Sequence, residues 1–141
     1  MKTNFGFNVK YNNTGKNLQG NLNFIIRSGS RIYQIKSNAM NSLAIKQGKT
    51  SGCTTATATN PCAVTFTSKA NLTDITDPTN TISLGGNLNM IVNMTDMGEP
   101  GSSDTFAITL YDASNNLLFS SNWSGTQTME QVLGGGNVVV H

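Results

Sequence analysis

The sequence predicts an all-β fold, and three observations lead to that prediction. The chain has 19 Asn, 18 Thr, 13 Ser and 14 Gly, whereas charged residues make up only 11% of it. Thr favours strands, and Asn, Ser and Gly favour the turns between strands. Apolar and polar residues alternate with a period of two in several segments that turn residues separate. This spacing predicts an antiparallel β-sandwich, Ig-like or jelly-roll-like, formed by a single domain 1–141.

The alternation places the expected strands along the chain. They are 4–11, 18–27, 31–36, 39–46, 64–72, 87–94, 106–110, 117–123 and 138–140. Residues 47–62 form a Thr- and Gly-rich loop, and only 126–133 allows a short helical turn. Five phenylalanines on alternating positions are expected in the core: Phe5, Phe7, Phe24, Phe66 and Phe106.

An internal similarity links two of these strands. Residues 18–26 and 84–92 are identical at six of nine positions. One interpretation is two related halves of a pseudo-symmetric sandwich, and the other is chance similarity in an Asn-rich chain.

Charge is separated along the chain. All nine basic residues precede residue 70, and all seven acidic residues follow it. Opposite charges can pair across strands inside the fold, or they can form two surfaces that meet head to tail and build a filament. The net charge of +2 is too small to indicate a nucleic-acid partner. No apolar run approaches the roughly 20 residues that span a bilayer, so membrane insertion is not expected.

The two cysteines, Cys53 and Cys62, are expected to form a local disulfide, with two free thiols as the alternative. A disulfide predicts an oxidising compartment, and therefore a secreted or cell-surface protein.

Catalysis is not expected, because the only histidine is His141 and no nucleophile–base motif occurs. The loop that contains Asp96, Glu99 and Asp104 is a candidate Ca²⁺ site, since Ca²⁺ prefers carboxylate and carbonyl oxygens. The alternative is a solvated turn whose Asp side chains bond local amides.

Trp123 lies at a strand end beside a turn, and together with Asn122 and Tyr111 it is a candidate glycan-binding platform. The alternative is a tryptophan that closes one end of the core.

Three segments and the chain's ending carry a resemblance to a known family: 69–78 (KANLTDITDP), 86–88 (GNL), 95–106 (TDMGEPGSSDTF) and the final GGGNVVVH. They resemble the C-terminal β-rich, post-anchor (post-COAP-type) domains of large secreted bacterial proteins. The resemblance implies an accessory extracellular module with no known activity. We therefore expect a non-catalytic structural or adhesion module that self-assembles through charged surfaces or edge-strand addition. A Ca²⁺-assisted carbohydrate-binding module is the alternative.

Overall fold

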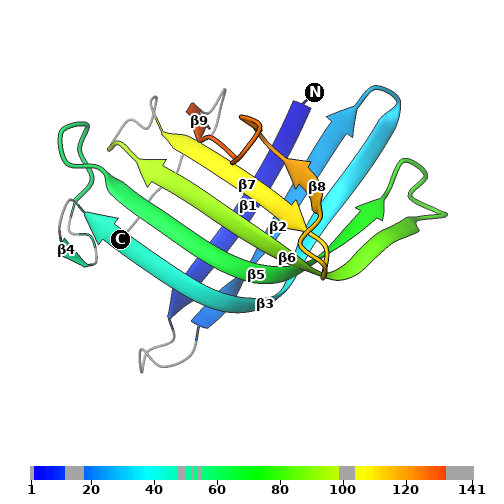
Figure 1. Ribbon diagram of the computed structural model, residues 1–141, viewed down its shortest axis with the longest axis horizontal. Coiled ribbons are helices and arrows are strands. Elements are labelled where there is room, and N and C mark those ends of the chain that lie inside the picture. Colours follow the sequence, from blue (N-terminus) through cyan, green and yellow to red (C-terminus); the bar gives the residue numbers. More distant parts are fainter. Residues whose placement is uncertain are drawn as a thin grey trace. The chain divides into compact units, whose positions relative to one another are not determined.

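Strands make up most of the computed structural model, which describes residues 2–11, 18–47, 50–51, 53, 55–98 and 104–132. No helix occurs among these residues (Figure 1). The strands are β1 (Lys2–Tyr11), β2 (Leu18–Ser28), β3 (Arg31–Gln47), β4 (Thr50–Ser51), β5 (Cys62–Asp74), β6 (Ile82–Asp96), β7 (Thr105–Tyr111), β8 (Leu117–Ser120) and β9 (Gln131–Val132).

Seven strands form one open antiparallel sheet in the order β1-β2-β3-β5-β6-β7-β8. The short strands β4 and β9 pair with β3 and β7 (Figure 1). The prediction of an all-β antiparallel fold is thus confirmed, and the sheet is compatible with the predicted sandwich.

Hairpins fix the register at the start of the sheet. β1 pairs with β2 along its whole length, from Lys2 opposite Arg27 to Tyr11 opposite Leu18. Two residues then connect β2 to β3, where Ser28 lies opposite Arg31. Gly29 has φ 60°, a left-handed conformation that suits a tight hairpin and that glycine adopts without strain. The chain therefore turns between the strands expected at 18–27 and 31–36.

Contacts along the chain divide it into two compact units. Unit 1 comprises Met1–Ser42, Thr67–Met90 and Tyr111–Asn116, and unit 2 comprises Leu43–Phe66, Ile91–Leu110 and Leu117–His141. The strands β3, β5 and β6 each contribute one segment to each unit. Each unit is described by itself below.

Each unit has an apolar core on the alternating face of its strands. In unit 1 the buried side chains include Leu22, Phe24, Ile26, Ile35 and Met90; in unit 2 they include Phe66, Val92, Met94, Phe106 and Ile108. Burial is the main favourable contribution to folding, so this alternation determines which face of each strand turns inward. Of the phenylalanines expected in the core, Phe24, Phe66 and Phe106 are confirmed, while the side chains of Phe5 and Phe7 lie outside the described residues.

The two similar segments bury equivalent positions. Leu22, Phe24 and Ile26 of β2 are 2% exposed or less. The matching residues of β6, Leu88, Met90 and Val92, are 5% exposed or less. The shared sequence therefore encodes the same inward face on both strands.

One expectation about local structure was wrong, and one structure that the sequence allowed does not occur. The segments 31–36 and 39–46 form one strand, β3, because its polar middle residues bond to neighbouring strands. Ser37 Oγ accepts the Leu22 N–H at 2.7 Å, and Asn38 exchanges side-chain hydrogen bonds with Asn71. The described part of 126–133 is also not helical, because Thr128 pairs with Trp123 and Gln131 belongs to β9. The expected strand 138–140 lies outside the described residues.

Candidate functional site

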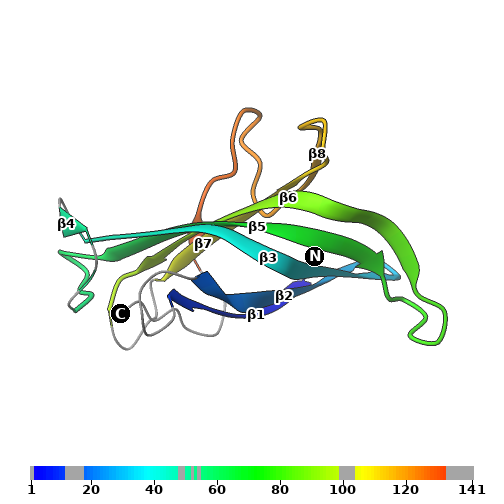
Figure 2. The same cartoon turned by 90° about the horizontal axis from the view of Figure 1, so that it is seen from below.

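A hairpin on one face of the sheet in unit 2 creates a surface pocket that is lined by described residues. The chain leaves β8 at Ser121, whose N–H donates to the Ile108 carbonyl of β7 at 3.1 Å. It turns at 124–127, where the Ser124 N–H donates to the Gln127 carbonyl at 2.9 Å, and returns with the Met129 N–H bonded to the Asn122 carbonyl. Figure 2 shows this segment rising from the face formed by β6 and β7. We call residues 121–130 the outer hairpin.

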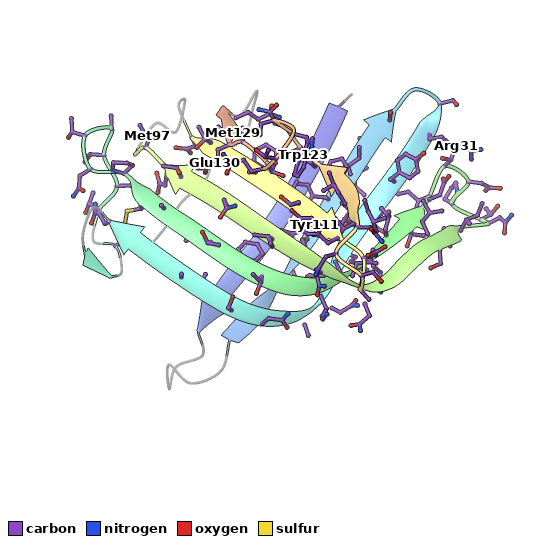
Figure 3. The ribbon with its side chains drawn as sticks, in the orientation of Figure 1. Arg31, Met97, Tyr111, Trp123, Met129 and Glu130 are labelled. Carbon is purple, nitrogen blue, oxygen red and sulfur yellow. A yellow bond between two sulfur atoms is a disulfide. The ribbon has the colours of Figure 1, made fainter. Side chains whose placement is uncertain are left out.

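The pocket lies between the returning side of the outer hairpin and strands β5 and β6. Its volume is about 270 Å³. The lining includes Ala63 and Thr65 of β5, Asn93 and Met94 of β6, and Met129 and Glu130 of the hairpin. Figure 3 shows Met129 and Glu130 on neighbouring positions of the hairpin, which also carries Trp123.

Hydrogen bonds hold the polar walls of the pocket in place. The Thr65 hydroxyl donates to Asn93 Oδ1 at 2.7 Å and thereby orients the Asn93 amide. Glu130 Oε1 accepts hydrogen bonds from the hydroxyls of Thr95 at 3.0 Å and Thr105 at 3.3 Å. The hairpin itself is joined to β7 through Thr109, whose hydroxyl donates to Thr128 Oγ1 at 2.6 Å. Hydroxyl groups from β5, β6 and β7 therefore fix the Asn93 amide and the Glu130 carboxylate.

The residues predicted to bind a glycan come from the outer hairpin and from the end of β7. Asn122 and Trp123 lie on the outer hairpin, and Trp123 is 42% exposed. Tyr111 is half-buried at the end of β7 and belongs to unit 1. None of the three lines the pocket. A platform made from all three residues stays a prediction.

Two of the three predicted Ca²⁺ ligands meet at the turn that follows β6. Asp96 Oδ1 accepts the Gly98 N–H at 2.8 Å, and Asp104 Oδ1 accepts the Met97 N–H at 3.0 Å. Both aspartates are buried, at 3% and 0% exposure. These bonds are those of the alternative interpretation, in which Asp side chains hold local amides.

Gly98 explains why the chain after β6 lies so close to the loop before β5. Its φ is 95°, and a Cβ atom there would lie 2.7 Å from the Ala56 carbonyl oxygen. Glu99, the third predicted ligand, lies outside the described residues, among which no group of three His, Cys, Asp or Glu side chains is placed to hold a metal. The Ca²⁺ site stays a prediction.

The expected disulfide is present. Cys53 and Cys62 are bonded, with their Cα atoms 6.0 Å apart, and Cys62 at the start of β5 is fully buried. The bond closes the loop that precedes β5 in unit 2. It indicates an oxidising compartment, which is where such bonds persist.

The separation of charge along the sequence becomes a separation between the two units. Over the ranges given above, unit 1 has seven basic and three acidic residues, a net charge of +4. Unit 2 has two basic and four acidic residues, a net charge of −2.

Some of the charge is paired within unit 1. Arg31 at the start of β3 donates to Asp74 Oδ2 at 3.2 Å. Hydrogen bonds from the Thr76 hydroxyl and backbone N–H, helped by Arg31, lower the pKa of Asp74. Lys69, by contrast, donates to the neutral amide of Asn89, and Arg27 and Lys36 are exposed. The internal pairing that the sequence allows is therefore realised at Arg31 but not at Lys69.

Sequence reasoning missed the residues that form the pocket. Alternation along β5 and β6 places Thr65 and Asn93 on the outward face, and this is the only signal that they share. Nothing in the sequence places Gln127 or Glu130 beside Thr65 and Asn93. The outer hairpin brings these distant residues together only when it packs on the sheet.

No family model, curated protein or solved structure matches this chain. The resemblance to post-anchor domains stays a prediction. Among the described residues, no helix is long and apolar enough to cross a membrane.

Proposed function

We propose that this chain is a non-catalytic, extracellular structural or adhesion module that assembles with further copies of itself. The division of charge supports the proposal, since unit 1 has a net charge of +4 and unit 2 a net charge of −2. Complementary charge steers two proteins together and suppresses the wrong orientation. The disulfide fits a module that works outside the cell.

The edge of the sheet at β1 offers a surface on which a second copy of the chain can pair. β1 is ten residues long and pairs with β2 alone among the described strands. An edge of this kind presents backbone N–H and C=O groups that a strand from another chain can pair with. Lys2 and Lys10 add positive charge to the β1 sequence, which favours an acidic partner surface. A contact between unlike surfaces of successive copies is heterologous, and where it does not close it produces a filament.

Light scattering and negative-stain microscopy of the purified full chain test this proposal. At low salt we expect species larger than a monomer that grow with protein concentration. In about 1 M salt, where the Debye length is about 3 Å, these species should dissociate because the charge attraction is screened.

A pair of charge-reversal variants separates the β1 edge from charge in general. Lys10→Glu on β1 should reduce the assembly, because it brings a negative charge to the edge that meets an acidic surface. Lys36→Glu is the matched control, since Lys36 is exposed on β3, a strand with neighbours on both sides. A chain that is monomeric at every concentration contradicts self-assembly, and equal losses in both variants contradict the role of β1.

A further inference from the structure

We propose that the pocket beneath the outer hairpin binds a single ring of a neutral saccharide. This site differs from the Trp123 platform and from the acidic loop, and it does not depend on self-assembly. Its volume of about 270 Å³ is just below the range of roughly 300–1,000 Å³ that is typical of small-molecule sites. A pocket of this size suits one ring of a longer glycan whose remaining units stay in solvent.

The pocket provides both a donor and an acceptor that the fold does not use. Asn93 Oδ1 accepts from Thr65, and no hydrogen bond from Asn93 Nδ2 occurs among the described residues. Glu130 Oε1 accepts from Thr95 and Thr105, while Glu130 Oε2 has no partner in the same part of the chain. Saccharide hydroxyls donate and accept at once, so neighbouring hydroxyls can accept from the amide and donate to the carboxylate. Hydrogen bonds to an ionised carboxylate are the stronger kind.

The bonds that hold these two groups also prepare them for a ligand. Thr65 fixes the Asn93 amide, and two hydroxyls fix the Glu130 carboxylate, so little rotational freedom remains to be lost on binding. Preorganisation of this kind raises affinity because it reduces the entropy cost of binding.

The apolar residues of the lining match the C–H face of a sugar ring, whereas Asn93 and Glu130 match its hydroxyls. Ala63 and Met129, both exposed, contribute apolar atoms to the pocket, and the C–H groups of a pyranose form an apolar face. Methionine side chains adapt to irregular shapes, which suits a ligand with axial and equatorial substituents.

Charge selects the class of ligand. Among the described residues that line the pocket, Glu130 is the only ionisable side chain and no Lys, Arg or His occurs. An anionic ligand such as a sulfated or uronic sugar would meet a like charge and no cation. A neutral saccharide keeps the favourable hydrogen bonds to Glu130 without that repulsion.

The test is a titration of the ¹⁵N-labelled full chain with four methyl glycosides: α-D-glucoside, α-D-mannoside, β-D-galactoside and N-acetyl-β-D-glucosaminide. We expect saturable shifts of the amides of Thr65, Asn93 and Gln127–Glu130 with at least one of them, at dissociation constants on the order of 1 mM. Trp123 is the only tryptophan and pairs with Thr128, so its fluorescence gives an independent readout.

Variants then identify the side chains that bind the methyl glycoside. Asn93→Ala and Glu130→Ala should each weaken binding about tenfold. Asn89→Ala is the matched control, because Asn89 also lies on β6 and also accepts one hydrogen bond from β5, from Lys69, but it does not line the pocket. It should leave the affinity unchanged.

Several results would overturn the proposal. One is the absence of pocket shifts with all four glycosides at about 50 mM, far above the expected dissociation constant. Shifts caused by acetate or choline but by no glycoside would point to an ionic ligand, and equal losses in Asn89→Ala and Asn93→Ala would place binding elsewhere. The wild-type shift map decides the question even where a variant fails to fold.

Discussion

The outward polar residues of unit 1 and unit 2 are of the same types, but they are used differently. In unit 1, Asn71 exchanges two side-chain hydrogen bonds with Asn38, each 3.0 Å long, and its Oδ1 also accepts the Asn87 N–H at 3.2 Å. In unit 2, Asn93 accepts one hydrogen bond, from Thr65, on a strand that the outer hairpin partly covers.

This difference shows how an abundant residue type acquires a function. An amide whose oxygen and one N–H are used by its neighbours stabilises the strand pairing and has less left to offer a ligand. An amide that is held by one bond and faces a pocket remains able to bind. The outer hairpin creates the second situation, because it closes a space over Thr65 and Asn93 that would otherwise be open surface.

The largest expected effect distinguishes the two units by stability. The disulfide lies in unit 2 alone, and it closes a loop with a sequence separation of nine. The double variant Cys53→Ala, Cys62→Ala should lower the free energy of unfolding by about 2–4 kcal/mol, because the unfolded chain gains freedom when the loop opens. Urea denaturation measures this change.

Amide hydrogen exchange locates the loss of stability in the cysteine double variant. We expect faster exchange at Val92 and Ile108 in unit 2, with Phe24 and Ile35 in unit 1 nearly unchanged. Equal acceleration at all four amides would mean that both units unfold together, and the distinction between them would then be one of contacts only.

A smaller effect compares the two asparagines directly. Asn71→Ala should lower the free energy of unfolding by about 1 kcal/mol, because it removes three hydrogen bonds at an exposed site where water partly replaces them. Asn93→Ala should cost less than about 0.5 kcal/mol and should instead weaken saccharide binding. Thermal and urea unfolding give the stabilities. A larger loss of stability from Asn93→Ala than from Asn71→Ala would reverse the comparison.

The smallest expected effect is acid sensitivity in unit 1. Asp74, Asp77 and Asp112 have lowered pKa values, because hydrogen bonds from Thr76, Thr79 and Asn116 respectively stabilise their charged forms. A lowered folded-state pKa adds stability above the unfolded pKa of about 3.9, and this stability is lost as the pH falls through the folded value.

The urea midpoint should therefore be flat near neutral pH and should fall below about pH 4. Asp112→Asn should make that fall shallower, since it removes one group that must be protonated. Asp112 also accepts the Ser114 and Asn116 N–H groups, so the overall stability at pH 7 should fall as well. A fall of unchanged steepness in the variant would show that Asp112 does not contribute to the acid response.

Short-range patterns predicted most of the strands and the local disulfide. Period-two alternation located the core positions of β2, β5 and β6, because a strand with one buried face must place every second side chain inward. In β7 the residues between the alternating apolar positions, Ala107 and Thr109, are buried as well. The cysteines are close enough in sequence for their pairing to be expected. The same short-range reasoning divided β3 wrongly, because Ser37 and Asn38 resemble turn residues until Leu22 and Asn71 are seen to bond with them.

The sequence by itself determined that this chain forms strands, which of their faces is apolar, and that two cysteines can meet. Only the tertiary structure decided the strand order, the division of charge between two units, and the pocket made by β5, β6 and the outer hairpin. The physical reason is the range of the interactions. Alternation and turns depend on neighbouring residues, whereas Asn93 and Glu130 line one pocket only because strand pairing brings together segments that are distant in the chain.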